Sequence, residues 1–131
     1  MSAEPGSHDA EFVGITYAHD NATAQLHLLH AGVEQSILIL SGIRHLRLND
    51  FGLQNVVSRI LVSTKHAFSV EEIREYVQWA RSQHDFRSIL DGAQLQDLVP
   101  AIATRKAILL VVEPSVGAEL LCLCAGVQHQ T

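Results

Sequence analysis

Residues 37–63, ILILSGIRHLRLNDFGLQNVVSRILVS, hold the pattern from which the fold is predicted. In residues 37–40 both alternating sets of side chains are apolar, so a strand here has no face suited to water and needs cover on both sides. Ser41 and Gly42 interrupt this run, and a glycine inside a strand pattern usually marks a bulge or a close approach of two backbones. The stretch therefore predicts two long strands, the first of which is irregular near Gly42.

A polar corner joins these two strands. Residues 49–52, Asn-Asp-Phe-Gly, suit a turn because Asn and Asp tolerate left-handed backbone and Gly takes positive φ. Arginine forks and amide side chains near this turn can recognise carboxylates and backbone groups, so we expect a binding surface here. The alternative is that the arginines pair with local acids and the asparagines satisfy the turn backbone. The candidate binding residues are Arg44, His45, Arg47, Asn49, Asp50 and Asn55.

Alternating apolar patterns on both sides of this stretch predict further strands. The first two strands are joined by a tight turn at residues 19–21 and should form a hairpin, which the next two strands extend into a meander. The last two strands should pair as a second hairpin, with its turn at residues 113–117. The predicted strands are residues 11–18, 22–30, 37–48, 56–62, 107–112 and 118–125. They make a mostly antiparallel sheet of about six strands.

One principal helix is predicted after these strands. Ser69 and Glu72 have the spacing of a capping box, and an apolar stripe at helical spacing runs on through Val77. This amphipathic helix should pack on the sheet. Residues 94–99 could add one or two helical turns, but Pro100 disfavours a helical conformation at Val99. The predicted fold class is therefore α+β, with one principal helix on the sheet.

Length and charge set further limits. The chain of 131 residues is predicted to be a single domain over 1–131, with a disordered tail at residues 1–7. Nine Lys and Arg stand against fourteen Asp and Glu, a net charge of −5, which argues against nucleic acid as a partner. The first residues lack the features of a signal peptide, and no apolar run is long enough to cross a bilayer, so a cytoplasmic protein without membrane contact is expected.

The usual catalytic and cofactor motifs are missing from the sequence. Residues 50–52 spell the Asp-Phe-Gly of protein kinases, but no glycine-rich loop or His-Arg-Asp accompanies them. Cys122 and Cys124 fall in an apolar strand, which predicts a buried, reduced pair rather than a nucleophile. We therefore predict no catalytic residue and no cofactor.

The eight histidines raise the possibility of a metal site, but their spacing does not support one. His27 and His30 stand three apart on a predicted strand and so point to opposite faces. A composite site of His8, Asp9 and either His27 or His45 remains an alternative. No metal site is predicted from the spacing alone.

A resemblance to a known group of proteins covers roughly residues 7–62. It rests on a His-Asp-Ala entry to the first strand, the alternating hairpin, a Gly-Ile-x-x-Leu step at residues 42–46, the Asp-Phe-Gly corner, and an Asn-Val-Val return at residues 55–57. This pattern resembles small bacterial immunity proteins of polymorphic toxin systems. The resemblance implies a non-catalytic cytosolic binder that blocks a toxin, and it transfers no set of functional residues.

Three hypotheses about function follow. The first is a non-catalytic protein-binding module, with an immunity-like toxin inhibitor as its specific form. The second is a small metal-dependent or ligand-binding enzyme that uses the composite His/Asp site. The third is a self-associating structural protein whose outer strand pairs across a homodimer.

Overall fold

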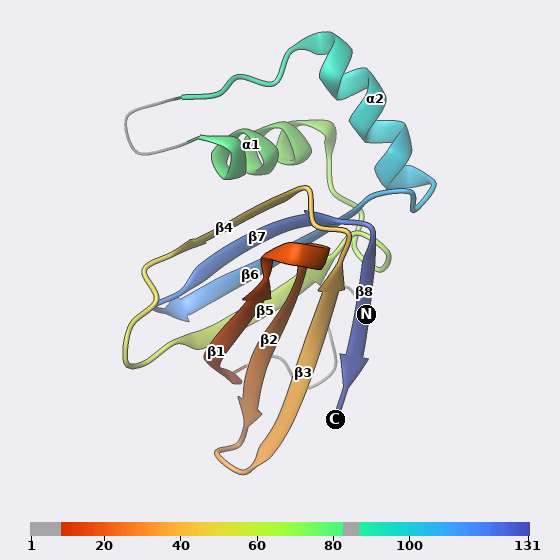
Figure 1. The fold of residues 1–131 in the computed structure, drawn as a ribbon. Helices are drawn as coiled ribbons and strands as arrows, with labels where there is room; N and C mark the ends of the chain where they lie inside the picture. The colour runs from red at the N-terminus through yellow and green to blue at the C-terminus, as the bar shows by residue number, and fades with distance from the viewer. Residues whose placement is uncertain (1–8, 83–86) are drawn as a thin grey trace.

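The computed structural model describes residues 9–82 and 87–131. The predicted tail at residues 1–7 lies outside these ranges, as does His8. Within them the chain forms one antiparallel sheet and two α-helices, which bears out the α+β class (Figure 1). In chain order the elements are β1 (Glu11–Ala18), a 3-10 turn (His19–Asn21), β2 (Thr23–His30), β3 (Glu34–Ser41), β4 (His45–Asn49), β5 (Val56–Val62), α1 (Val70–Arg81), α2 (Gly92–Ala103), β6 (Ile108–Val116), β7 (Glu119–Cys124) and β8 (Gly126–Gln130).

The sheet has eight strands in the order β4-β7-β6-β5-β1-β2-β3-β8, so the prediction of about six was wrong. The first predicted long strand divides at Gly42 into β3 and β4. The last predicted strand does not end at residue 125 but bends there and continues as β8. The predicted meander of four strands was wrong as well, because β4 leaves its neighbour β3 and pairs with β7, while β5 pairs with β1 and β6.

The two bends face each other and close the sheet on itself. Ala125 donates its backbone N–H to the Ser41 carbonyl at 2.9 Å, and Arg44 donates to the Leu123 carbonyl at 2.8 Å. These bonds carry the pairing from β3–β8 across to β4–β7, which stand at the two ends of the strand order. The two backbones approach closely at Gly42, since a Cβ atom there would lie 2.7 Å from the Cβ of Ala125.

Closure gives the sheet an inner and an outer face, and each has its own apolar cluster. The inner cluster joins the two halves of the sheet and includes Phe12, Leu26, Leu38, Ile60, Leu110 and Leu120, all with at most 1% of their surface exposed. The outer cluster lies between β5, β6, β7 and the two helices. The helices thus cover one half of the outer face only (Figure 1). Ile37 and Ile39, for which cover on both sides was predicted, point to the other half and are half-buried.

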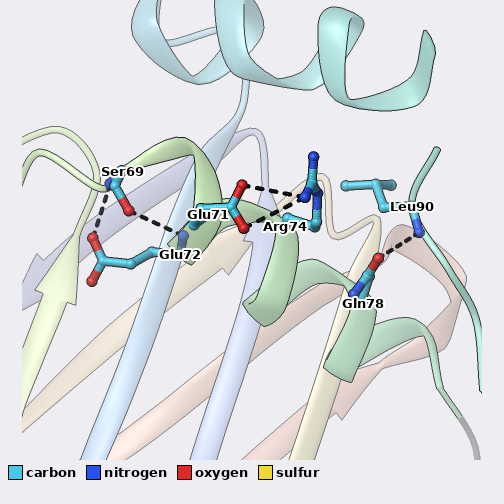
Figure 2. A network of polar contacts seen from close by, with 6 residues as sticks. All are labelled: Ser69, Glu71, Glu72, Arg74, Gln78 and Leu90. Atoms are coloured by element: carbon cyan, nitrogen blue, oxygen red, sulfur yellow. Dashed lines mark hydrogen bonds and ion pairs between the residues drawn. The ribbon is translucent and has the colours of Figure 1, made fainter. Parts of the chain in front are cut away.

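Helix α1 begins as predicted. Ser69 accepts from the Glu72 backbone N–H at 3.1 Å, and the Glu72 carboxylate accepts from the Ser69 N–H at 2.9 Å (Figure 2). Both contacts satisfy N–H groups that the first helical turn leaves without partners. Ile73 and Val77 are buried in the outer cluster, so the predicted apolar stripe does face the sheet.

The prediction of one principal helix was incomplete, because α2 is of the same length as α1. It runs through Val99 and Pro100, where the sequence predicted a break. Proline removes one hydrogen bond from a helix interior. The opposing contributions are a second capping box, from Asp91 and Gln94, and the burial of Leu95, Leu98 and Ile102 against the outer cluster.

The predicted turn at residues 113–117 was also wrong over most of its length. Strand β6 continues through Pro114 to Val116, and the chain reverses at Gly117. Pro114 is tolerated because it lies opposite Val57, where the β5–β6 register shifts, and beyond Val112, the last residue that pairs with β7.

The bend at Gly42 gives a direct test of sheet closure. Gly42 has φ +62°, and its added methyl would meet a Cβ fixed to the opposite backbone. We expect Gly42→Ala to lower the free energy of unfolding by about 1 to 3 kcal/mol. Gly92→Ala is the matched control, since its added methyl would meet no atom within 4 Å beyond its chain neighbours and the backbone of its own helix. It should change stability by about 1 kcal/mol or less. Urea denaturation of both variants measures the free energy of unfolding. Equal stabilities of the two variants would contradict the close approach of the backbones at Gly42.

Candidate functional site

The structure spreads the six candidate binding residues along β4 and the connections at its two ends instead of gathering them in one place. His45 pairs with Leu123 at one end of the strand, and Asn49 pairs with Glu119 at the other. Arg44 and His45 therefore lie at the first end of β4, close to the helices. Asp50 and Asn55 belong to the opposite end, in the connection to β5. Arg47 lies between the two groups.

Arg44 and His45 line a cavity of about 360 Å³, which we call the arginine pocket. Its remaining walls come from the two helices and the segment between them. Because the end of α1 lies beside β4, the pocket combines Val77 and Arg81 of α1 with Gln94, Asp97 and Leu98 of α2. The lining residues are Arg44, His45, Val77, Arg81, Leu90, Gln94, Asp97 and Leu98.

Hydrogen bonds between the elements hold the walls of the pocket together. Gln78 of α1 accepts from the Leu90 backbone N–H at 2.9 Å, which ties the segment before α2 to α1 (Figure 2). Arg81 donates to the Gln94 side-chain oxygen at 3.3 Å. Gln94 thus serves both the start of α2 and the guanidinium at the end of α1.

The charges in the pocket are not balanced internally. Within residues 9–82 and 87–131, the Arg44 guanidinium has no hydrogen bond or ion pair, and Asp97 forms no ion pair with Arg44 or Arg81. Two guanidinium groups therefore face one carboxylate on the rim. Such an arrangement can accept a carboxylate or another small anion.

His45 adds a third basic group whose charge depends on pH. Burial lowers the pKa of His45, and the nearby Arg81 and Arg44 guanidinium groups lower it further. The imidazole is therefore neutral at neutral pH and can donate or accept a hydrogen bond. An anion placed between the arginines would offset their effect on the imidazole.

Arg47 has a different role, since it caps the end of α1. Its guanidinium donates to the carbonyls of Trp79 at 2.6 Å and Ser82 at 3.1 Å, and it stacks over the Trp79 ring at 4.3 Å. The last carbonyls of a helix have no partner within the helix and carry its partial negative charge. Asn49 supports this cap by accepting from Arg47 at 3.3 Å. Neither residue lines the arginine pocket.

Asn55 joins three segments of backbone and is almost fully buried. Its side-chain oxygen accepts from Gly52 at 2.9 Å and from Ala118 at 3.0 Å. Its amide nitrogen donates to the carbonyls of Gly52 at 2.9 Å and Phe12 at 3.2 Å. The neighbouring Asp50 has φ +61° and is exposed, as suits a turn. For Asn55 these contacts match the alternative in which the asparagines satisfy the turn backbone, whereas the Asn49 side chain accepts from Arg47 instead.

Of the composite His/Asp site, His8 lies outside the described residues, and the structure keeps Asp9 apart from His45. The Asp9 backbone N–H bonds to the carbonyl of Val57, which lies opposite Pro114 of β6. His45 pairs with Leu123, which lies opposite Leu109 of β6. Five residues of β6 separate these two levels, about 17 Å along a strand. Among the residues that the structure describes, no three His, Cys, Asp or Glu side chains are grouped so that they could bind a metal ion.

Cys122 and Cys124 are free and buried, as predicted. A hydrogen bond with the Cys124 side chain and burial raise the pKa of the Cys122 thiol. Both side chains point into the inner cluster. Cys122 is thus held in its protonated, unreactive form.

The sequence did not identify the helix residues that complete the pocket. Arg81 stands four positions after Val77 and so continues the apolar stripe of α1 toward the sheet. A charged residue in that position was a usable signal. Gln94 and Asp97 could not be found, because α2 was not predicted at its full length.

Comparisons with known proteins found no matching protein-family model, no matching curated protein and no matching solved structure. A further finding concerns membranes: neither α1 nor α2, the helices of the described residues, has the length and apolar character needed to cross one.

Asn55 can be tested as a structural residue. Asn55→Ala would leave the buried Ala118 N–H and the Phe12 carbonyl without partners, so we expect a loss of about 2 to 4 kcal/mol in the free energy of unfolding. Gln54→Ala, at the exposed neighbouring position, should change stability by about 0.5 kcal/mol or less. Urea denaturation compares the two, and a fully stable Asn55→Ala variant would show that the ties are dispensable.

His45 gives a second test, through its protonation. Its pKa should lie below that of a free histidine, and Arg44→Ala or Arg81→Ala should each raise it. At a pH between the folded and unfolded pKa values, His45 binds more protons in the unfolded chain than in the folded chain. The contribution of His45 therefore makes the protein less stable as the pH falls through that window. NMR titration of the imidazole measures the pKa. An ordinary or raised value would contradict the geometry of the pocket.

Proposed function

We propose that this chain is a protein-binding module that holds a carboxylate of its partner in the arginine pocket. The observation that carries the proposal is the Arg44 guanidinium, which lines a cavity with Arg81 and has no partner of its own among the described residues. A guanidinium binds a carboxylate through two parallel hydrogen bonds, which gives orientation as well as affinity.

The other walls of the pocket favour an amino-acid side chain over a free inorganic anion. Val77, Leu90 and Leu98 supply apolar surface. The methylene groups of an Asp or Glu side chain can pack there while its carboxylate reaches the arginines. Asp97 on the rim can accept a backbone N–H from the same segment of the partner. The volume of about 360 Å³ is adequate for one or two side chains.

The charge of the whole chain argues for a local contact and against a polyanion. The net charge of −5 would repel a nucleic acid, whereas one carboxylate seated between Arg44 and Arg81 meets a local excess of positive charge. An immunity-like inhibitor that blocks a toxin is a specific form of this proposal, in keeping with the resemblance of residues 7–62. The pocket would then meet an acidic residue on the toxin.

The proposal is tested by recovering the partner with variants of the pocket. Tagged protein expressed in its host should co-purify with a stoichiometric partner, and Arg44→Ala should weaken that complex by about tenfold or more because the carboxylate loses its paired hydrogen bonds. Binding should also weaken with added salt and strengthen as the pH falls through the pKa of His45, since a protonated imidazole adds a third positive charge.

Arg74→Ala is the matched control. Arg74 also lies on α1 but pairs with Glu71 at 3.2 Å and does not line the pocket (Figure 2). This variant should bind the partner like the wild type. Recovery of the wild-type protein alone, or equal binding by the Arg44→Ala and wild-type proteins, would overturn the proposal.

A further inference from the structure

Strand β8 ends the sheet with an edge that pairs with no further strand of the described chain. It stands last in the strand order and pairs through Gly126–Gln130 with β3 alone. Figure 1 shows it at the margin of the sheet, on the half that the helices do not cover. An edge strand presents a row of N–H and C=O groups that can pair with another strand.

The opposite edge of the sheet is protected, which makes the contrast informative. Strand β4 packs against α1, and its Arg47 reaches across to the carbonyls of Trp79 and Ser82. Natural proteins protect sheet edges in this way, or with charged residues, prolines and bulges. Residues 126–130 contain no proline and no Asp, Glu, Lys or Arg, and their register with β3 is unbroken. Apart from its length of only five residues, β8 therefore lacks the devices that keep an edge from pairing.

We propose that β8 is the interface with a second copy of this chain, formed by antiparallel pairing of two β8 strands across a two-fold axis. The strand suits its own copy because full overlap of residues 126–130 places Gln128 opposite Gln128 of the other copy. Directly opposed side chains lie about 5 Å apart on one face, so the two exposed amides can hydrogen-bond to each other.

Charge also favours a second copy at this edge. Each chain carries a net charge of −5, but residues 35–41 of β3 and 126–130 of β8 contain no Asp, Glu, Lys or Arg. The repulsion between copies therefore acts over a distance and is screened at physiological salt. Dimerisation through β8 uses none of the residues that line the arginine pocket.

The experiment measures association and then reverses it with charge. Sedimentation equilibrium of the wild-type protein over a wide range of concentrations should show a monomer–dimer equilibrium. Gln128→Lys should abolish the dimer, because two like charges would meet at the axis, and Gln128→Glu should do the same. Mixing the Gln128→Lys and Gln128→Glu proteins should restore a heterodimer, since the opposed charges then attract.

Two further readouts separate a specific interface from a folding defect. Gln96→Lys, on the exposed face of α2, should leave the dimer unchanged. Amide hydrogen exchange in residues 126–130 should slow as the concentration of wild-type protein rises. A wild-type monomer at every concentration, a dimer that Gln128→Lys does not affect, or a mixture that fails to associate would each overturn the proposal. Arg44→Ala should dimerise normally, so failure of this proposal and failure of the binding function are distinguishable.

Discussion

The contact between the bends at Gly42 and Ala125 determines the architecture of this protein. At this point two backbones approach so closely that a Cβ on residue 42 would lie 2.7 Å from the Cβ of Ala125. The approach turns β4 away from β3 and toward β7, and it brings the two ends of the strand order together. The enclosed apolar cluster and the position of Arg44, two residues beyond the bend, both follow from it.

Local patterns were sufficient to predict the elements with a strong periodic signal. The limits of β1 and β5 and the capping box of α1 agree with the structure, because alternation and capping depend on residues close together in the sequence. What could not be predicted was pairing over long distances. The partner of β4 depends on a bend at Gly42 meeting a bend at Ala125, and no feature near residue 42 specifies that. β8 was missed because the alternation after residue 125 is short and polar.

The candidate site shows the same division. Arg44 and His45 were selected from their residue types, and they do line a cavity. Arg47 and Asn55 have the same chemistry, yet one caps a helix and the other ties three backbone segments together. Residue type gives the capacity for hydrogen bonding, whereas the surrounding elements decide which groups are left to bind something else. Arg81 joined the pocket only once α1 was placed on the outer face of the sheet.

The separation in sequence between Ser41 and Ala125 also bears on how the chain is made. Contacts between residues this far apart form slowly, because a long loop must be closed before they contribute any stability. A nascent chain that has not yet released residue 125 from the ribosome cannot close the sheet, and it leaves Leu38 and Leu40 of β3 without their inner cluster. Until residue 125 emerges, such an intermediate exposes an apolar strand, which makes it prone to aggregation.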